Sequence, residues 1–407
     1  MNKWKIYIPD GVRDILVDDC FQKRNVEKEI RETFRHRGFQ EIVTPTIEFF
    51  DSFSGQEDII SQESMVKFFD NEGRILVLKP DLTVPVARVA ATKYKDRRPL
   101  KLFYIQNIFR DNKDRQFHLK EYTQAGCEII GIGEPKADGE LIATAIEALK
   151  ATGLKEFTVE LGQVGYFKGL MEESGLKMED RESLRQLVMK KDFLGLEKYV
   201  EALDLSQDLR EAIVELPGLY GDISLLERIE RHTLPCGAAA AIANLREVIA
   251  ILDDYGLLDY IAIDMGMVTA LHYYTGLTFQ AFIPNLGFPL LGGGRYDRLV
   301  ERFGVADVAT GFSLNINLLL DVLTPMELDR NDIFIGYQAN YRQDAIAMAE
   351  EFRRKGYRVE LDLQGLTQEE AASYCHRMGI RELFYYEKPK RAVHAVFEKG
   401  RKDGWTI

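Results

Sequence analysis

Apolar residues near the N-terminus recur at helical spacing and then change to a strand pattern. Val26, Ile30 and Phe34 stand four residues apart among charges, which predicts an amphipathic helix over 21–37. Gly38 is the expected C-cap of this helix. Further strand-like runs are predicted at 39–43, 75–78, 102–109, 128–132 and 157–161, with a helix at 139–152.

The pattern changes between about 163 and 258, where charged residues interleave with leucines at helical spacing and strand signals disappear. We interpret this stretch as a helical insertion. Strand character returns at 260–268 and 277–282, and a glycine-rich stretch begins at Gly292.

The C-terminal part has a pattern of its own. A charged, proline-containing stretch at 324–332 predicts a linker, and the segments IFIGY, 342–355 and YRVEL after it predict a β-α-β unit. Two more short strands are expected at 383–386 and 393–397. We therefore predict an α+β protein with a sheet domain over 1–323, which carries the insertion, and a small α/β domain over 331–407.

Composition and charge narrow the classes of protein to which this chain could belong. The formal net charge of −12 gives no overall basic footprint for nucleic acid, and the short basic runs at 388–391 and 399–402 are typical of a solvated surface. No window offers about 18 uncharged apolar residues for a membrane span, and no signal peptide precedes Pro9, so we expect a cytoplasmic protein. Four distant cysteines and six scattered histidines predict no disulfide framework, no metal site and no cofactor.

Asp81 and Thr83 stand between two prolines, Pro80 and Pro85. Proline restricts the backbone, so a carboxylate and a hydroxyl are presented rigidly and could grip an ammonium group. The alternative is a helix cap, because the helical run VARVAATKY follows directly.

A second polar set lies on one predicted strand. Gln124, Gly126 and Glu128 share a face because side chains alternate with period two, while Cys127 and Ile129 supply the apolar opposite face. The polar face suits either a small polar ligand or plain solvent.

Two further motifs carry aromatic residues and glycines. Tyr273 and Tyr274 place one ring on each face of a strand, either for packing or for ligand contact. The stretch Leu291-Gly-Gly-Gly-Arg-Tyr-Asp297 permits close backbone approach, but no lysine followed by serine or threonine gives it the spacing of a phosphate-binding loop.

In order and spacing together, these motifs resemble the histidyl-tRNA synthetase family over about residues 5–323. The matching stretches are Gly38–Pro45 (class II motif 1), Phe109-Arg110 with Gln124–Glu128 (motif 2), and Tyr273-Tyr274 with Leu291–Asp297 (the histidine signatures). The resemblance implies a class II aminoacyl-tRNA synthetase-like antiparallel sheet with flanking helices, dimeric through motif 1. The tail at 331–407 resembles a truncated anticodon-binding domain, whose shortness argues against tRNA recognition.

Carried over residue by residue, the resemblance implies that the histidine-binding residues are kept and that the catalytic and ATP-binding residues are lost. The implied histidine pocket falls on Asp81, Thr83, Arg110, Gln124, Glu128, Tyr273 and Tyr274, with Asp81 in place of a glutamate. The positions at which the synthetases hold catalytic or ATP-binding groups are Thr269 and Leu318 (arginines in the family) and Asn112 (a glutamate). Each lost charge-stabilising group costs about 10²–10³ in rate, so we expect no catalytic residue and negligible adenylation.

This combination resembles the regulatory subunits of ATP phosphoribosyltransferase, the first enzyme of histidine biosynthesis. The resemblance implies a non-catalytic subunit that senses free L-histidine and forms a hetero-oligomer with the short-form catalytic subunit, whose activity requires it. Two alternatives stay open: a divergent active histidyl-tRNA synthetase, and another synthetase paralogue that binds a translation factor or RNA.

Overall fold

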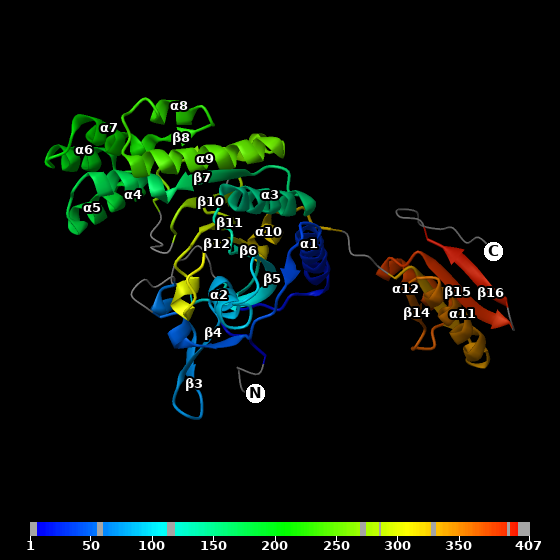
Figure 1. The fold of residues 1–407 in the computed structure, drawn as a ribbon. Coiled ribbons are helices and arrows are strands. Elements are labelled where there is room, and N and C mark those ends of the chain that lie inside the picture. The colour runs from blue at the N-terminus through cyan, green and yellow to red at the C-terminus, as the bar shows by residue number, and fades with distance from the viewer. Residues whose placement is uncertain are drawn as a thin grey trace. The chain divides into compact units, whose positions relative to one another are not determined.

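The computed structural model describes residues 6–54, 60–111, 119–268, 274–284, 286–326, 331–388 and 391–397. The chain divides into two compact units, 1–324 and 325–407 (Figure 1). The helices of the first unit are α1 (Val17–His36), α2 (Thr83–Thr92), α3 (Pro135–Ala151), α4 (Val164–Glu173), α5 (Met178–Met189), α6 (Phe193–Glu201), α7 (Gln207–Glu215), α8 (Leu225–Ile229), α9 (Cys236–Asp254) and α10 (Ile316–Val322). No described helix is both long and apolar enough to cross a membrane.

The strands of the first unit belong to two sheets. They are β1 (Gln40–Glu41), β2 (Ile47–Phe49), β3 (Lys67–Phe69), β4 (Ile75–Leu78), β5 (Leu100–Phe109), β6 (Glu121–Ile130), β7 (Thr158–Gln163), β8 (Tyr220–Gly221), β9 (Ile261–Asp264), β10 (Leu277–Phe282), β11 (Leu291–Arg295) and β12 (Ala309–Asn315). Within the described residues the large sheet has the order β1-β5-β6-β12-β11-β10-β7-β9-β8, and β2, β4 and β3 form a small sheet.

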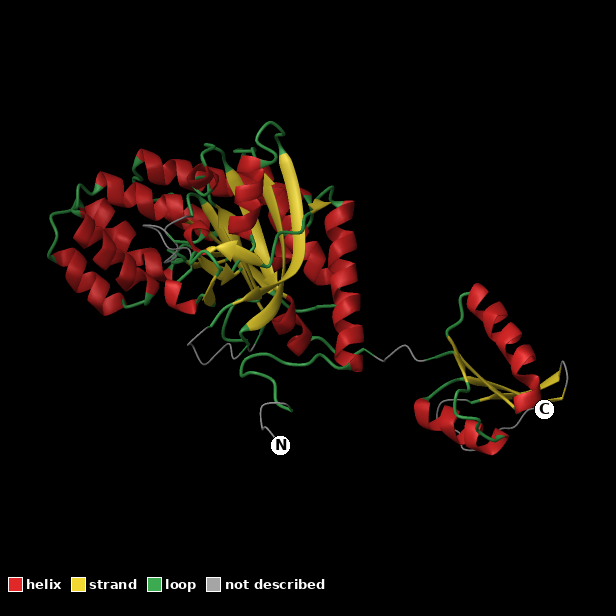
Figure 2. Cartoon of the chain, turned by 90° about the horizontal axis from the view of Figure 1, so that it is seen from below, coloured by secondary structure: helices red, strands yellow, loops and turns green. Residues whose placement is uncertain are grey.

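The strands from β5 to β7 in this order are antiparallel to their neighbours, whereas β1 and β9 pair in parallel at either end of that group. An antiparallel sheet with flanking helices was predicted, and the structure confirms it; Figure 2 shows the sheet between helices.

The two faces of the large sheet differ in what covers them. Helices α1, α3 and α10 pack on one face over apolar side chains such as Phe103, Cys127 and Phe312. Helix α2 packs on the other face, whose buried cluster contains Tyr104 and Tyr296. The first face is an apolar core, and the second carries hydroxyl groups. The polar motifs therefore gather on the α2 face.

Helix α1 follows the predicted pattern. Val26, Ile30 and Phe34 are at most 3% exposed, because a four-residue spacing keeps them on one stripe of the helix. Gly38 adopts φ +80° directly after the helix, the left-handed conformation in which glycine has no Cβ to strain. The predicted helix and its C-terminal glycine are confirmed, with the start four residues earlier than expected.

Helices α4 to α9 lie together at one end of the first unit (green in Figure 1). The two-residue strand β8 interrupts them and pairs with β9, although no strand was expected there. The strand predicted at 260–268 ends at Asp264, because the Asp264 carboxylate accepts a hydrogen bond from the Gly266 N–H at 2.8 Å and turns the chain.

The second unit is a small α/β sandwich. Its strands β13 (Ile333–Tyr337), β14 (Val359–Leu361), β15 (Glu382–Lys388) and β16 (Arg391–Val396) form a sheet in the order β14-β13-β15-β16. Helix α11 (Arg342–Arg354) contacts β13 and β14, and α12 (Gln368–Met378) contacts β13 and β15. Strands β13 and β14 are parallel, as the β-α-β pattern predicted.

Candidate functional site

A buried carboxylate lies at the centre of the α2 face. Glu128 on β6 is 0% exposed, and its Oε1 accepts a hydrogen bond from the Tyr104 hydroxyl at 3.0 Å. Its Oε2 accepts one from the Tyr296 hydroxyl. We call Asp81, Thr83, Tyr104, Glu128 and Tyr296 the Glu128 cluster.

The register of the sheet makes room for this carboxylate. Gly311 on β12 lies directly opposite Glu128, and a Cβ at Gly311 would overlap Glu128 Oε2. On the other side, Tyr104 on β5 lies opposite Gly126, which leaves space for the tyrosine ring over β6. Two glycines on neighbouring strands therefore leave the space that the side chains of Glu128 and Tyr104 occupy.

The surroundings of Glu128 set its protonation. Burial raises its pKa to about 8, since a charged carboxylate loses its hydration there. Hydrogen bonds from Tyr296, Thr83 and Tyr104 act in the opposite direction, and the nearby charge of Asp81 adds to the rise. Near neutral pH the site therefore holds a carboxyl group that a cationic ligand could ionise.

Asp81 and Thr83 stand at the start of α2. Asp81 Oδ1 accepts a hydrogen bond from the Val84 N–H at 3.2 Å, so the capping interpretation holds for this carboxylate. Its Oδ2 also lies 3.5 Å from Arg110 Nη2, and Arg110 Nε donates to the Pro80 carbonyl at 2.6 Å. Capping and site geometry are thus compatible: Asp81 and Thr83 lie beside Glu128, and Arg110 lies beside Asp81.

Gln124 lies on the same face of β6 as Glu128, four positions earlier in the strand. It is 6% exposed, so the solvated-face alternative is wrong for both residues. Among the described residues its Oε1 has no hydrogen-bond partner. An unpaired buried carbonyl oxygen costs about 1–3 kcal/mol, which favours a ligand that brings a donor.

Tyr274 is 8% exposed and belongs to the same buried cluster as Tyr104 and Tyr296. Tyr273 and two of the positions predicted as lost catalytic groups, Thr269 and Asn112, lie outside the described residues. The structure thus collects six of the seven predicted pocket residues on the α2 face and leaves the seventh without a description.

Leu318 lies in the first turn of α10. Its side chain is partly buried and packs against the apolar core, and its N–H is capped by the Asn315 side chain at 3.2 Å. A leucine in this position offers no charge to a phosphate. The replacement of the family's arginine by Leu318 therefore removes a positive charge from this position of the folded chain.

Two residues of the Glu128 cluster, Tyr104 and Tyr296, were not among the predicted pocket residues. Tyr296 belongs to the glycine-rich motif at 291–297, so the sequence could have indicated it as a site residue. Tyr104 lies in a strand whose sequence has no motif that points to a site. The neighbouring Arg295 is structural, because its Nη2 lies 2.8 Å from Asp138 on α3 and its Nη1 donates to the Ile132 carbonyl at 3.2 Å.

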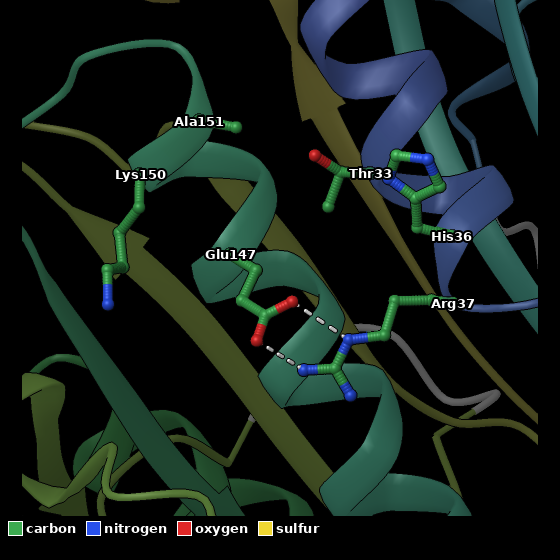
Figure 3. A pocket seen from close by; sticks show the side chains of 6 residues that line it. All are labelled: Thr33, His36, Arg37, Glu147, Lys150 and Ala151. Carbon is green, nitrogen blue, oxygen red and sulfur yellow. Dashed lines mark hydrogen bonds and ion pairs between the residues drawn. The ribbon is translucent and has the colours of Figure 1, made fainter.

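A hollow of about 580 Å³ lies between the ends of α1 and α3 (Figure 3). Its main charged group, Arg37, pairs with Glu147 at 2.6 Å and with Glu140 at 3.0 Å. Figure 3 shows Lys150 turned away from this pair. Because Glu147 and Glu140 neutralise the guanidinium, we interpret this hollow as a surface feature of the ion-paired contact between α1 and α3, not as a ligand site.

No group of three or more His, Cys, Asp or Glu side chains in the described parts of the chain could hold a metal ion. The four cysteines are free.

The chain is similar to known proteins along its whole length. A family model described as histidyl-tRNA synthetase matches residues 11–319. The ATP phosphoribosyltransferase regulatory subunit of Acetivibrio thermocellus is 49% identical over 100% of this chain and 99% of its own length. The same-named protein of Ruminiclostridium cellulolyticum is 45% identical over 95% of this chain and 93% of its own. The chain belongs to the family of ATP phosphoribosyltransferase regulatory subunits.

Solved structures agree with this family. A regulatory subunit/histidyl-tRNA synthetase from Bacillus halodurans has a TM-score of 0.84 at 33% identity, covering 93% of this chain and 98% of that one. Histidyl-tRNA synthetase from Nostoc has a TM-score of 0.80 at 17% identity, covering 96% and 94%, which shows the shared fold. The predicted class II synthetase-like fold is confirmed.

Proposed function

We propose that this chain is a non-catalytic regulatory subunit of ATP phosphoribosyltransferase that binds free L-histidine at the Glu128 cluster. The main support for the proposal is a buried set of acceptors, Glu128, Asp81 and Gln124, on the α2 face of the sheet. The chain also has a leucine at position 318, where the synthetases hold an arginine. The family name of its relatives supports the regulatory role.

The chemistry of histidine fits these acceptors. Its α-ammonium could donate hydrogen bonds to Asp81 and Gln124, and a protonated imidazole could donate one to Glu128 as that carboxyl ionises. Tyr274, with the undescribed Tyr273, would enclose the ring. A ligand donor would satisfy the buried Gln124 Oε1, and positive charge would be stabilised by the carboxylates of Asp81 and Glu128, which gives selectivity for a ligand with two cationic ends.

Loss of catalysis is proposed from three positions. Leu318 gives an aliphatic contact where the synthetases hold an arginine, and the sequence has Thr269 and Asn112 at the other two. Each removed group costs about 10²–10³ in rate, so the combined loss leaves negligible activation of histidine.

We further propose that the chain works in a cytoplasmic hetero-oligomer with the short-form catalytic subunit, and that it dimerises through its class II core. The domain at 331–407 would be a shortened anticodon-binding domain without a role in tRNA recognition. Histidine bound at the Glu128 cluster would change the affinity of the catalytic partner for its substrates, and those substrates would change the affinity for histidine by the same factor.

Titration calorimetry with histidine tests the site. The full chain should bind, and Gln124→Leu should weaken binding because it removes an acceptor. The matched control Gln186→Leu alters an exposed glutamine on α5 and should leave binding unchanged. Absence of binding at millimolar histidine, for the chain alone and with its partner, contradicts the sensor role.

Two further assays separate the alternatives. Histidine-dependent pyrophosphate exchange by the purified chain would favour a divergent synthetase and refute the non-catalytic role. Purification of the tagged chain from its native cell should recover a phosphoribosyltransferase. Recovery of a translation factor or RNA in its place would favour the other paralogue class.

A further inference from the structure

The first helix of the insertion contacts the candidate ligand residue Tyr274 directly. Helix α4 begins where β7 ends, and the Val164 N–H donates to the Gly276 carbonyl at 3.0 Å. About one turn later, Lys168 Nζ donates to the Tyr274 carbonyl at 3.0 Å. A charged donor from the insertion therefore fixes the backbone of a residue whose ring packs in the buried cluster of Tyr104 and Tyr296.

Helix α4 has little freedom to move by itself. It crosses α9 in close contact, since a Cβ at Gly169 would overlap the backbone nitrogen of Ala238, and one at Gly165 would lie 3.3 Å from the Ala241 Cβ. Glycine at these positions lets the two backbones approach each other. A shift of α9 therefore carries α4, and with it Lys168.

The insertion also holds the chain just after β9. Lys191, between α5 and α6, lies with its Nζ 3.2 Å from Asp264 Oδ2. The Met265 N–H donates to the Leu219 carbonyl at 3.0 Å. The insertion thus contacts both described ends of the connection between β9 and β10, at 264–268 and at 274–276.

We propose that Lys168 is a positioning residue for the amino-acid site and that it couples the helical insertion to ligand occupancy. This inference rests on the proposed function, because it assigns Lys168 to the same histidine site. Histidine in contact with Tyr274 would favour the position of α4 that the Lys168 contact requires. A partner that shifts the insertion would in turn change histidine affinity, since coupling between sites is reciprocal.

The first test is histidine calorimetry on the full chain. Lys168 is exposed, so Lys168→Met should preserve the fold and lower the melting temperature only slightly. We expect histidine affinity to fall about threefold to tenfold, the size of one ordinary hydrogen bond, because solvent weakens the contact of the exposed Lys168. Lys168→Arg retains a donor and should stay within about twofold of the wild type. Lys198→Met, on the exposed face of α6, is the matched control and should match the wild type.

The second test is amide hydrogen exchange with and without histidine. Histidine should slow exchange in α4 and α9 of the wild type and of Lys168→Arg, but not of Lys168→Met. Equal affinity and equal exchange for Lys168→Met and the wild type overturn the inference while leaving histidine binding intact. A loss in Lys168→Met that Lys168→Arg does not restore also overturns it. A wild-type chain that binds no histidine refutes the proposed function itself.

Discussion

Glu128→Gln should remove a large part of the pH dependence of this protein's stability between about pH 5 and pH 8. Glutamine has the same shape as glutamate and cannot ionise. Its carbonyl can still accept from Tyr104, and its amide can donate to the Tyr296 hydroxyl. The substitution therefore changes the titration of the site while it preserves the packing.

The magnitude follows from the raised pKa. In the folded chain the pKa of Glu128 rises from 4.5 to about 8, chiefly because of burial. Below the pKa that Glu128 has in the unfolded chain, both states hold the proton and the free energy of unfolding has its full value. As the pH rises toward 8 the unfolded state ionises while the folded state keeps its proton, so the free energy of unfolding falls. At about 1.4 kcal/mol per pKa unit the fall reaches the order of 5 kcal/mol.

Urea unfolding at a series of pH values measures this effect. The wild type should lose several kcal/mol between pH 5 and pH 8.5 that Glu128→Gln does not lose, so the variant becomes the more stable protein at the alkaline end. Glu197→Gln, at an exposed position on α6, should follow the wild type. Parallel stability curves for the wild type and Glu128→Gln across this range would refute the assignment of a buried, protonated carboxyl.

Four other outcomes follow from the same contacts. Gly311→Ala places a methyl group where Glu128 Oε2 lies, so thermal unfolding should show a loss of about 1–3 kcal/mol in stability. Calorimetry should show a loss of histidine binding, and unchanged binding would mean that histidine does not need Glu128 in its present position. Arg295→Met strips the partner from Asp138, which is 0% exposed, and should cost about 3–5 kcal/mol in urea, whereas a cost under about 1 kcal/mol would show that this ion pair is dispensable. Leu318→Arg should not restore pyrophosphate exchange, since two other groups are missing, and any exchange would contradict the three-position argument. Histidine binding near pH 7 should move a proton from Glu128 to the largely neutral imidazole, so the heat of binding should depend little on the ionisation enthalpy of the buffer; a net release of about one proton to the buffer would argue against a bound imidazolium.

Much of the fold was predictable because its signals are local. The spacing of Val26, Ile30 and Phe34 specifies the buried stripe of α1, and Gly38 marks its end. Strands β4 and β10 begin and end where the sequence pattern predicted. Strand β12 was not predicted, because it is buried in the middle of the sheet and shows little alternation of polar and apolar residues.

The sequence by itself determined which residue types are present: acceptors at positions 81, 124 and 128, and no arginine at 269 or 318. Only the tertiary structure decided how they act together. The register between β6 and β12 places Gly311 against Glu128. The hydroxyls that reach this carboxylate come from Tyr104 on β5 and from Tyr296, just after β11, which are 24 and 168 residues away in the chain. The physical reason is that periodicity and capping act over a few residues, whereas burial and the pKa of Glu128 depend on long-range strand pairing.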